Sequence, residues 1–238
     1  MITSIFSIKN VFKATHKYIA KIIMVSALSL CILLVVVSAL DYYFIQMQSL
    51  AELHGNEFLD TLAEIGRILT NFLVSIHLIF LIPLRACDVS HNVPKLTSAS
   101  KFAMKTFWQL LLESIRAMAS VILWAIAFIL PGVYRSIQLY FVPFVVFFDK
   151  DYAAGEVDAL KRSVEIVKGS TVFIAVIIIS EAILGFGFKK VLEDYSALPA
   201  IGISIASYTF IILLSCYTYS LFFFFYSQKA ASLKGDPT

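Results

Sequence analysis

The chain has 238 residues, of which 60% are hydrophobic and 15% charged, and its mean hydropathy of +0.86 excludes an ordinary soluble globular domain. The formal net charge of +3 is too small to favour a nucleic-acid partner. Long apolar runs exclude a membrane barrel, whose strands alternate over segments of about ten residues. We therefore predict an all-α, polytopic bundle of transmembrane helices that forms a single integral membrane domain over residues 1–238.

Six apolar runs are long enough to cross a hydrocarbon core of about 30 Å as helices. In chain order we predict spans at 19–40, 68–84, 107–130, 132–148, 171–188 and 200–226. The first run follows several lysines and contains Val37-Ser38-Ala39, so a cleaved signal peptide is the alternative to a first membrane helix. The length of the run favours an uncleaved helix.

Basic residues gather on one side of these spans. Fourteen Lys and Arg residues fall in the N-terminus, the loops after the second and fourth spans and the C-terminus, against four in the remaining loops, with Arg116 set aside. The positive-inside rule therefore predicts that both termini are cytoplasmic. Residues 41–67 are predicted to form an external loop, which carries one basic residue and several acids.

Three short segments on the predicted cytoplasmic side combine lysines or arginine with apolar residues at helical spacing. Such amphipathic helices lie in the membrane interface, where each basic residue contributes about 1 kcal/mol near anionic lipid. We predict headgroup contacts for Lys9, Lys13, Lys17, Lys101, Lys105, Lys161, Arg162 and Lys168. Each segment precedes an outward span, which suggests three repeated units; selection for positive charge inside would give the same rhythm.

The third of these segments, Ala159–Ser170, has the clearest pattern. Its predicted apolar face contains Leu160, Ser163, Val164 and Val167, and its charged face contains Lys161, Arg162, Glu165 and Lys168. Asp158 and Arg162 have the spacing of a helical ion pair. Gly169 is a plausible end of the helix. We therefore predict a charged surface helix between the fourth and fifth spans.

The stretches LPGVY, Leu130–Tyr134, and FVPFVVFFDKDYAAGEVDALKRSVEIVKG, Phe141–Gly169, carry a family resemblance. They resemble the membrane domain attached to some bacterial glycerophosphodiester phosphodiesterases, and also related stand-alone six-helix inner-membrane proteins. The N-terminal SIKNVFKATHKYIAK is compatible with the opening surface helix of that family. The resemblance implies a six-helix fold in the bacterial inner membrane. The resemblance does not imply phosphodiesterase activity for this chain, because none of the loops between the predicted spans is long enough to hold a hydrolase barrel.

Ionisable residues within a span are costly and therefore functional candidates. Glu181 lies about 15 Å into the fifth span and His77 lies near the middle of the second, so the two side chains could meet. One hypothesis is a proton or ion pathway that uses both residues. The alternative is a neutral Glu181 that is hydrogen-bonded between helices.

Further polar residues and a turn signal complete the candidate sites. Glu113 and Arg116 could form a pair inside the membrane or lie at the cytoplasmic end of the third span, which could begin as late as Ala117. Asn71 is predicted to form a hydrogen bond between helices. Pro131 and Gly132 are predicted to make the tight turn between the third and fourth spans, or a gating kink.

Motifs of known chemistry are lacking: we find no phosphate loop, nucleophile motif, paired catalytic carboxylates or metal-ligand spacing. We therefore predict no catalytic residue, no metal site, no cofactor and no enzyme. The leading hypothesis is an inner-membrane protein that scaffolds partners or contributes to envelope and lipid homeostasis. Its expected partners are anionic membrane lipids, with a membrane protein or a second copy of the chain as further candidates. The alternative is a small transporter or channel component that uses Glu181 and His77.

Overall fold

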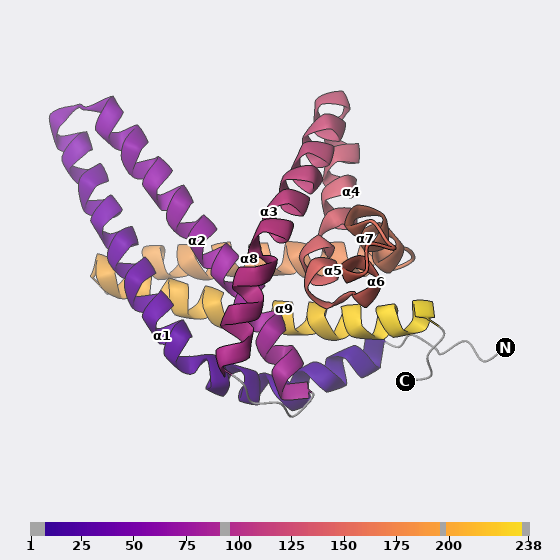
Figure 1. Cartoon of the computed structure of the whole chain (residues 1–238). Coiled ribbons are helices and arrows are strands. Elements are labelled where there is room, and N and C mark those ends of the chain that lie inside the picture. Colours follow the sequence, from indigo (N-terminus) through magenta and orange to yellow (C-terminus); the bar gives the residue numbers. More distant parts are fainter. Residues whose placement is uncertain (1–7, 91–95, 196–198, 235–238) are drawn as a thin grey trace. The chain divides into compact units, whose positions relative to one another are not determined.

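The computed structural model of the chain describes residues 8–90, 96–195 and 199–234, and all regular secondary structure in these ranges is helical (Figure 1). The helices are α1 (Ile8–His54), α2 (Glu57–Ser90), α3 (Leu96–Ala127), α4 (Ile129–Leu139), α5 (Val142–Phe148), α6 (Lys150–Ala153), α7 (Ala159–Val167), α8 (Thr171–Tyr195) and α9 (Ala200–Lys234). Six segments are long and apolar enough to cross a membrane: Ile8–His54, Glu57–Val89, Thr106–Ala127, Ile129–Phe148, Thr171–Leu192 and Ala200–Leu233. The predicted all-α architecture with six membrane-crossing segments is confirmed.

The chain divides into two compact units, a finer organisation than the single domain expected from composition. Unit 1 comprises Met1–Tyr18, Ala86–Ile179 and Ser220–Thr238, and unit 2 comprises Ile19–Arg85 and Ser180–Tyr219. Most of the Lys and Arg residues belong to unit 1, whereas unit 2 contains Lys21, Arg67, Arg85, Lys189 and Lys190.

In unit 2, α1 and α2 form a helical hairpin with a very short connection (Figure 1). The predicted external loop over 41–67 is wrong, because both helices continue through it and leave only residues 55–56 outside a helix. Gly55 adopts φ +61°, which glycine reaches without a steric penalty. Asn56 then accepts a hydrogen bond from the Leu59 N–H at 3.2 Å and caps the start of α2. The charged residues between Asp41 and Arg67 interrupt the apolar pattern of the sequence, but they do not interrupt the helices.

In unit 1, the connection between α3 and α4 is the single residue Phe128, which is extended with φ −159° and ψ 137° (Figure 1). The predicted turn at Pro131-Gly132 is therefore wrong. Pro131 is the third residue of α4, where a backbone N–H would lack a helical partner in any case. Gly132 instead permits close packing, since a Cβ at this position would lie 2.7 Å from the Cα of Ala125 on α3.

The predicted fourth span, 132–148, is interrupted within the structure. Its first part is α4 and its second part is α5, and residues 140–141 form a turn between them. Aromatic rings fill the unit 1 core behind this turn. The ring centroid of Phe141 lies 5.5 Å from that of Phe222 and 5.3 Å from that of Phe225, and all three side chains are fully buried. Aromatic burial of this kind is a major source of packing energy, so α9 anchors the α4–α5 turn.

Long apolar side chains project outward from several helices. On α1, Met24, Leu28, Ile32 and Val35 are all more than half exposed, and only 6% of the apolar part of α8 is buried. Water would make such surfaces costly, whereas lipid does not. The arrangement is that of a multi-pass membrane protein.

Candidate functional site

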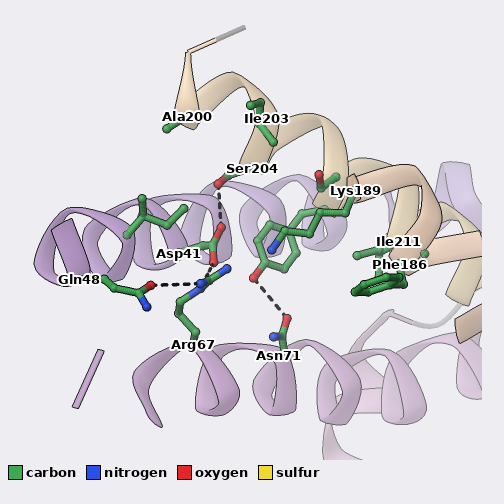
Figure 2. A pocket seen from close by; sticks show the side chains of 14 residues that line it. Asp41, Gln48, Arg67, Asn71, Phe186, Lys189, Ala200, Ile203, Ser204 and Ile211 are labelled. Atoms are coloured by element: carbon green, nitrogen blue, oxygen red, sulfur yellow. Dashed lines mark hydrogen bonds and ion pairs between the residues drawn. The ribbon is translucent and has the colours of Figure 1, made fainter. Parts of the chain in front are cut away.

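A polar cavity of about 470 Å³ lies within unit 2, lined by α1, α2, α8 and α9 (Figure 2). We call it the Asp41 pocket and define it by its polar lining residues Asp41, Gln48, Arg67, Asn71, Lys189, Ser204, Ser207 and Tyr208. Its other lining residues are largely apolar, including Ile45, Phe186, Ile203 and Ile211. The cavity therefore has a polar part and an apolar part.

The buried carboxylate of Asp41 organises this pocket. Its side chain is paired with the Arg67 guanidinium, whose Nε lies 3.2 Å from Oδ1, and it accepts a 2.7 Å hydrogen bond from the Ser204 hydroxyl. Arg67 also donates through Nη1 to the Gln48 amide oxygen at 3.4 Å (Figure 2). A carboxylate that is only 2% exposed needs such partners, because an unpaired buried charge is strongly destabilising.

Besides Ser204, the α9 wall of the pocket has two polar residues, Ser207 and Tyr208. The Tyr208 hydroxyl donates to the Asn71 amide oxygen at 3.2 Å, so Asn71, expected to bond between helices, connects α2 to α9 (Figure 2). Ser207 is 3% exposed and its hydroxyl has no hydrogen-bond partner among the described residues. Lys189 lines the pocket from α8.

In unit 1, the buried Arg162 forms ion pairs with the buried Asp149, the half-buried Asp151 and the exposed Glu165, a group that we call the Arg162 cluster. Its guanidinium lies 3.0 Å from Asp149 Oδ2, 3.1 Å from Glu165 Oε2 and 3.7 Å from Asp151 Oδ2. Burial lowers the pKa of Arg162, but hydrogen bonds to Asp149 and Glu165 more than offset this and raise it. The cluster fastens α7 to the segment that follows α5.

Two sequence predictions about this segment are therefore wrong. Arg162 was placed on the wet face as a headgroup contact, but it is 8% exposed and surrounded by carboxylates. Its predicted pair with Asp158 is replaced by Asp149, thirteen residues earlier. The inward face of α7 consists of Ala159, Arg162, Ser163, Ile166 and Val167. Arg162 can occupy a position on the inward face because Asp149, outside α7, neutralises its charge.

A second polar group in unit 1, the Arg116 cluster, contains Arg116, Glu113, Asp158 and Tyr152. Arg116 donates through Nη1 to both Glu113 carboxylate oxygens at 2.8 Å and through Nη2 to Asp158 at 2.7 Å. The predicted Glu113 and Arg116 are thus brought together, and the pair also connects α3 to the start of α7. Burial, followed by the Glu113 charge and hydrogen bond, raises the pKa of the Tyr152 hydroxyl.

Asp158 should stabilise unit 1 both as a helix cap and as an anion. Its Oδ1 accepts from the N–H groups of Leu160 at 3.0 Å and Lys161 at 3.1 Å, and the Arg116 hydrogen bond is the main cause that lowers its pKa. Because the folded pKa lies below the unfolded one, this stabilisation is present above about pH 4 and is lost as pH falls further. We expect Asp158→Ala to lower the free energy of unfolding by about 1–2 kcal/mol at pH 7.

Asp158→Asn separates the two contributions, because Asn caps helices well but carries no charge. Denaturant unfolding in detergent measures the stability of both proteins. Between about pH 5 and about pH 3, the range around the ordinary pKa of Asp, the variant should lose less stability than the natural chain does. Equal acid sensitivity of the two proteins would contradict the ionic part of the assignment.

Glu181 and His77 have separate partners within unit 2. The Glu181 carboxyl accepts a 2.6 Å hydrogen bond from the Ser215 hydroxyl, and Thr218 on the same helix is a second partner. The His77 Nε2 lies 3.1 Å from the Ser29 hydroxyl. The described contacts do not bring Glu181 and His77 together, and they place Glu181 in a hydrogen bond between α8 and α9.

The predicted headgroup lysines fall into two groups. Lys9, Lys13, Lys17, Lys161 and Lys168 are exposed. The side chains of Lys101 and Lys105 lie outside the described residues, although their backbone belongs to α3. On the N-terminal part of α1, the exposed lysines lie opposite Val11 and Thr15, which are fully buried.

A second cavity, of about 730 Å³, lies within unit 1 beside the Arg162 cluster. Aromatic side chains of α5 and α9 dominate its walls, and Asp149, Thr106 and Cys87 also line it. Across the described parts of both units, the structure contains no group of three or more His, Cys, Asp or Glu side chains that could hold a metal ion.

Sequence reasoning missed the Asp41 pocket. Asp41 and Arg67 were assigned to the ends of a loop, and Lys189 was only counted for orientation. One signal was present: Ser204, Ser207 and Tyr208 recur at three and four residues along α9 and share one face. Comparison of the chain with known protein families, characterised proteins and solved structures gives no match.

Proposed function

We propose that the chain is a non-enzymatic protein of the bacterial inner membrane that scaffolds partners or contributes to envelope and lipid homeostasis. In this proposal both termini are cytoplasmic, and the basic surface of unit 1 contacts anionic lipid headgroups. A relationship to the six-helix membrane domain of glycerophosphodiester phosphodiesterases belongs to the same proposal. It is supported by the sequence of Leu130–Tyr134 and Phe141–Gly169, which resembles that family.

One observation carries the proposal. Five lysines of unit 1, Lys9, Lys13, Lys17, Lys161 and Lys168, are exposed on or at the end of helical segments whose opposite faces are buried. In such segments one face is packed against the protein and the ammonium groups face outward. Each lysine near an anionic membrane surface contributes about 1 kcal/mol, so five together would hold lipid firmly.

Replacing these five lysines with Gln should abolish the preference of the protein for anionic lipid. We expect phosphatidylglycerol to raise the unfolding temperature of the natural chain more than phosphatidylcholine does, and the Gln variant to respond equally to both. The measurement is thermal unfolding in nanodiscs of each lipid. A variant with Arg at the same five positions keeps the charge and should behave like the natural chain.

An unchanged preference for phosphatidylglycerol in the Gln variant would refute the lysine contacts. The orientation is tested separately with single cysteines at positions 13 and 161 in a chain without its natural cysteines. Labelling by an impermeant reagent from opposite sides of the bilayer would contradict the shared cytoplasmic placement.

A further inference from the structure

Arg135 lies on α4, within a segment that is long and apolar enough to cross a membrane. Its guanidinium donates through Nε to the Ser120 hydroxyl of α3 and through Nη1 to the Gln138 amide oxygen, each at 3.1 Å. Both partners are neutral, so they orient the guanidinium without cancelling its charge. Among the described residues, Nη2 of Arg135 has no hydrogen-bond partner.

The neutral surroundings of Arg135 distinguish it from three other arginines of the chain. Arg67, Arg116 and Arg162 are each paired with a carboxylate at 3.2 Å or less. Within residues 8–90, 96–195 and 199–234, no carboxylate forms an ion pair with Arg135. A cation in a membrane segment is costly unless an anion or water accompanies it. An anion from outside the chain can therefore bind favourably at Arg135.

The place of Arg135 in unit 1 indicates which anion can reach it. Three residues further along α4, the Gln138 carbonyl accepts a 2.7 Å hydrogen bond from the Ser163 hydroxyl of α7. Three helical residues span about 5 Å, so Arg135 is about one turn away from α7. This is the charged helix with the exposed Lys161, which the proposed function places at the lipid headgroups. A long arginine side chain can extend to that level, where lipid phosphates are the abundant anions.

We infer that Arg135 binds the phosphate of a membrane phospholipid, with the Gln138 amide as a neutral donor beside it. The Gln138 oxygen accepts from Arg135, which leaves its NH₂ group as a donor. A guanidinium suits phosphate because its planar N–H groups can reach more than one oxygen. The acyl chains of the lipid lie along α3 and α4. There Val133 and Tyr134 are more than half exposed, and only 11% of the apolar part of α3 is buried.

The Arg135 site rests on the proposed function in placing α7 at the headgroups, but it uses different residues and a different feature of the lipid. The five surface lysines distinguish anionic from zwitterionic lipid, whereas Arg135 contacts a phosphate that both kinds of phospholipid contain. A preference for phosphatidylglycerol over phosphatidylcholine therefore reports on the lysines. A preference for phospholipid over diacylglycerol reports on Arg135, so each proposal can fail while the other holds.

The test uses the full chain with the five lysines replaced by Gln, so that their contacts do not contribute. The delipidated protein in an uncharged detergent is titrated with phosphatidylglycerol, with diacylglycerol that has the same acyl chains, or with inorganic phosphate. The rise in unfolding temperature measures binding. We expect phosphatidylglycerol to stabilise the protein and the other two probes to have little effect. Arg135→Gln should weaken the binding of phosphatidylglycerol about tenfold, as loss of a charged hydrogen bond does.

Arg116→Gln is the matched control, because it removes the same charge from the neighbouring helix α3, where Glu113 and Asp158 neutralise it. This variant should be less stable without lipid, but its affinity for phosphatidylglycerol should not change. Arg135→Gln should show the opposite pattern, with little loss of stability without lipid. Arg135→Lys keeps the charge and should lose less binding than Arg135→Gln does.

Several results would overturn the Arg135 site. Diacylglycerol could stabilise the protein as much as phosphatidylglycerol does, or the Arg135→Gln and Arg116→Gln variants could bind phosphatidylglycerol equally well. Stabilisation by inorganic phosphate without any response to phosphatidylglycerol would identify a soluble anion instead. A lipid-free dimer that Arg135→Gln dissociates would show that an acidic side chain of a second copy neutralises Arg135.

Discussion

Arg162→Gln is expected to lower the free energy of unfolding by about 3–5 kcal/mol, the cost typical of removing one partner of a buried ion pair. The Asp149 side chain is only 1% exposed and would lose the cation that lies 3.0 Å from it. Lys161→Gln is the matched control, because it removes the same charge from the neighbouring residue, which is exposed. Its effect should stay within about 0.5 kcal/mol. Unfolding of the purified variants in detergent measures both.

A double-mutant cycle identifies the cause of this loss. If the uncompensated Asp149 carboxylate is responsible, Asp149→Asn combined with Arg162→Gln should cost less than the sum of the two single changes. Strict additivity would show that Arg162 does not act through Asp149. A result in which Arg162→Gln and Lys161→Gln are equally mild would restore the view of Arg162 as a headgroup contact.

Gly132→Ala is expected to destabilise unit 1 by about 1–3 kcal/mol, although Ala is normally the better helix former. The added Cβ would lie 2.7 Å from both the Cα and the Cβ of Ala125, so α3 and α4 would have to move apart. The Ala125 backbone cannot move aside as a flexible side chain can. The single-residue connection at Phe128 also limits how far α3 and α4 can separate. Thermal unfolding in detergent should therefore show a lower transition temperature.

Gly187→Ala provides the comparison, because nothing lies within 4 Å of the position that its Cβ would occupy. There the helix propensity of Ala acts alone and should raise the free energy of unfolding by up to about 1 kcal/mol. Opposite signs at the two glycines are the expected outcome. Stabilisation at both positions would show that α3 and α4 do not approach as closely as the structure has them.

The comparison of sequence and structure is clearest at the α1–α2 hairpin. Hydropathy located both apolar spans. It placed the end of the first span at Leu40 and the start of the second at Ile68, because charged residues lie between these two positions. The backbone hydrogen bonds of a helix do not depend on the polarity of its side chains, so α1 and α2 extend to residues 54 and 57. The Asp41 pocket was missed for this reason, since Asp41, Gln48 and Arg67 were assigned to a loop.

The Ala159–Ser170 segment shows a second kind of miss. Its existence as a charged helix was predicted, and α7 occupies Ala159–Val167. Its orientation was not, because polarity normally indicates which face is outside. Arg162 can lie on the buried face because its guanidinium pairs with Asp149, which precedes α7 by several residues. A sequence pattern does not show which acid outside the helix will neutralise a buried cation.

The sequence by itself determined the all-helical class and the six membrane-crossing segments, because the cost of exposing backbone and apolar side chains depends mainly on local composition and length. Only the tertiary structure decided which polar groups meet. Asp41 and Ser204 are separated by 163 positions along the chain, yet their side chains lie 2.7 Å apart. A buried hydrogen bond or ion pair is specified by the packing of whole helices, and that packing arises from many contacts that no short stretch of sequence contains.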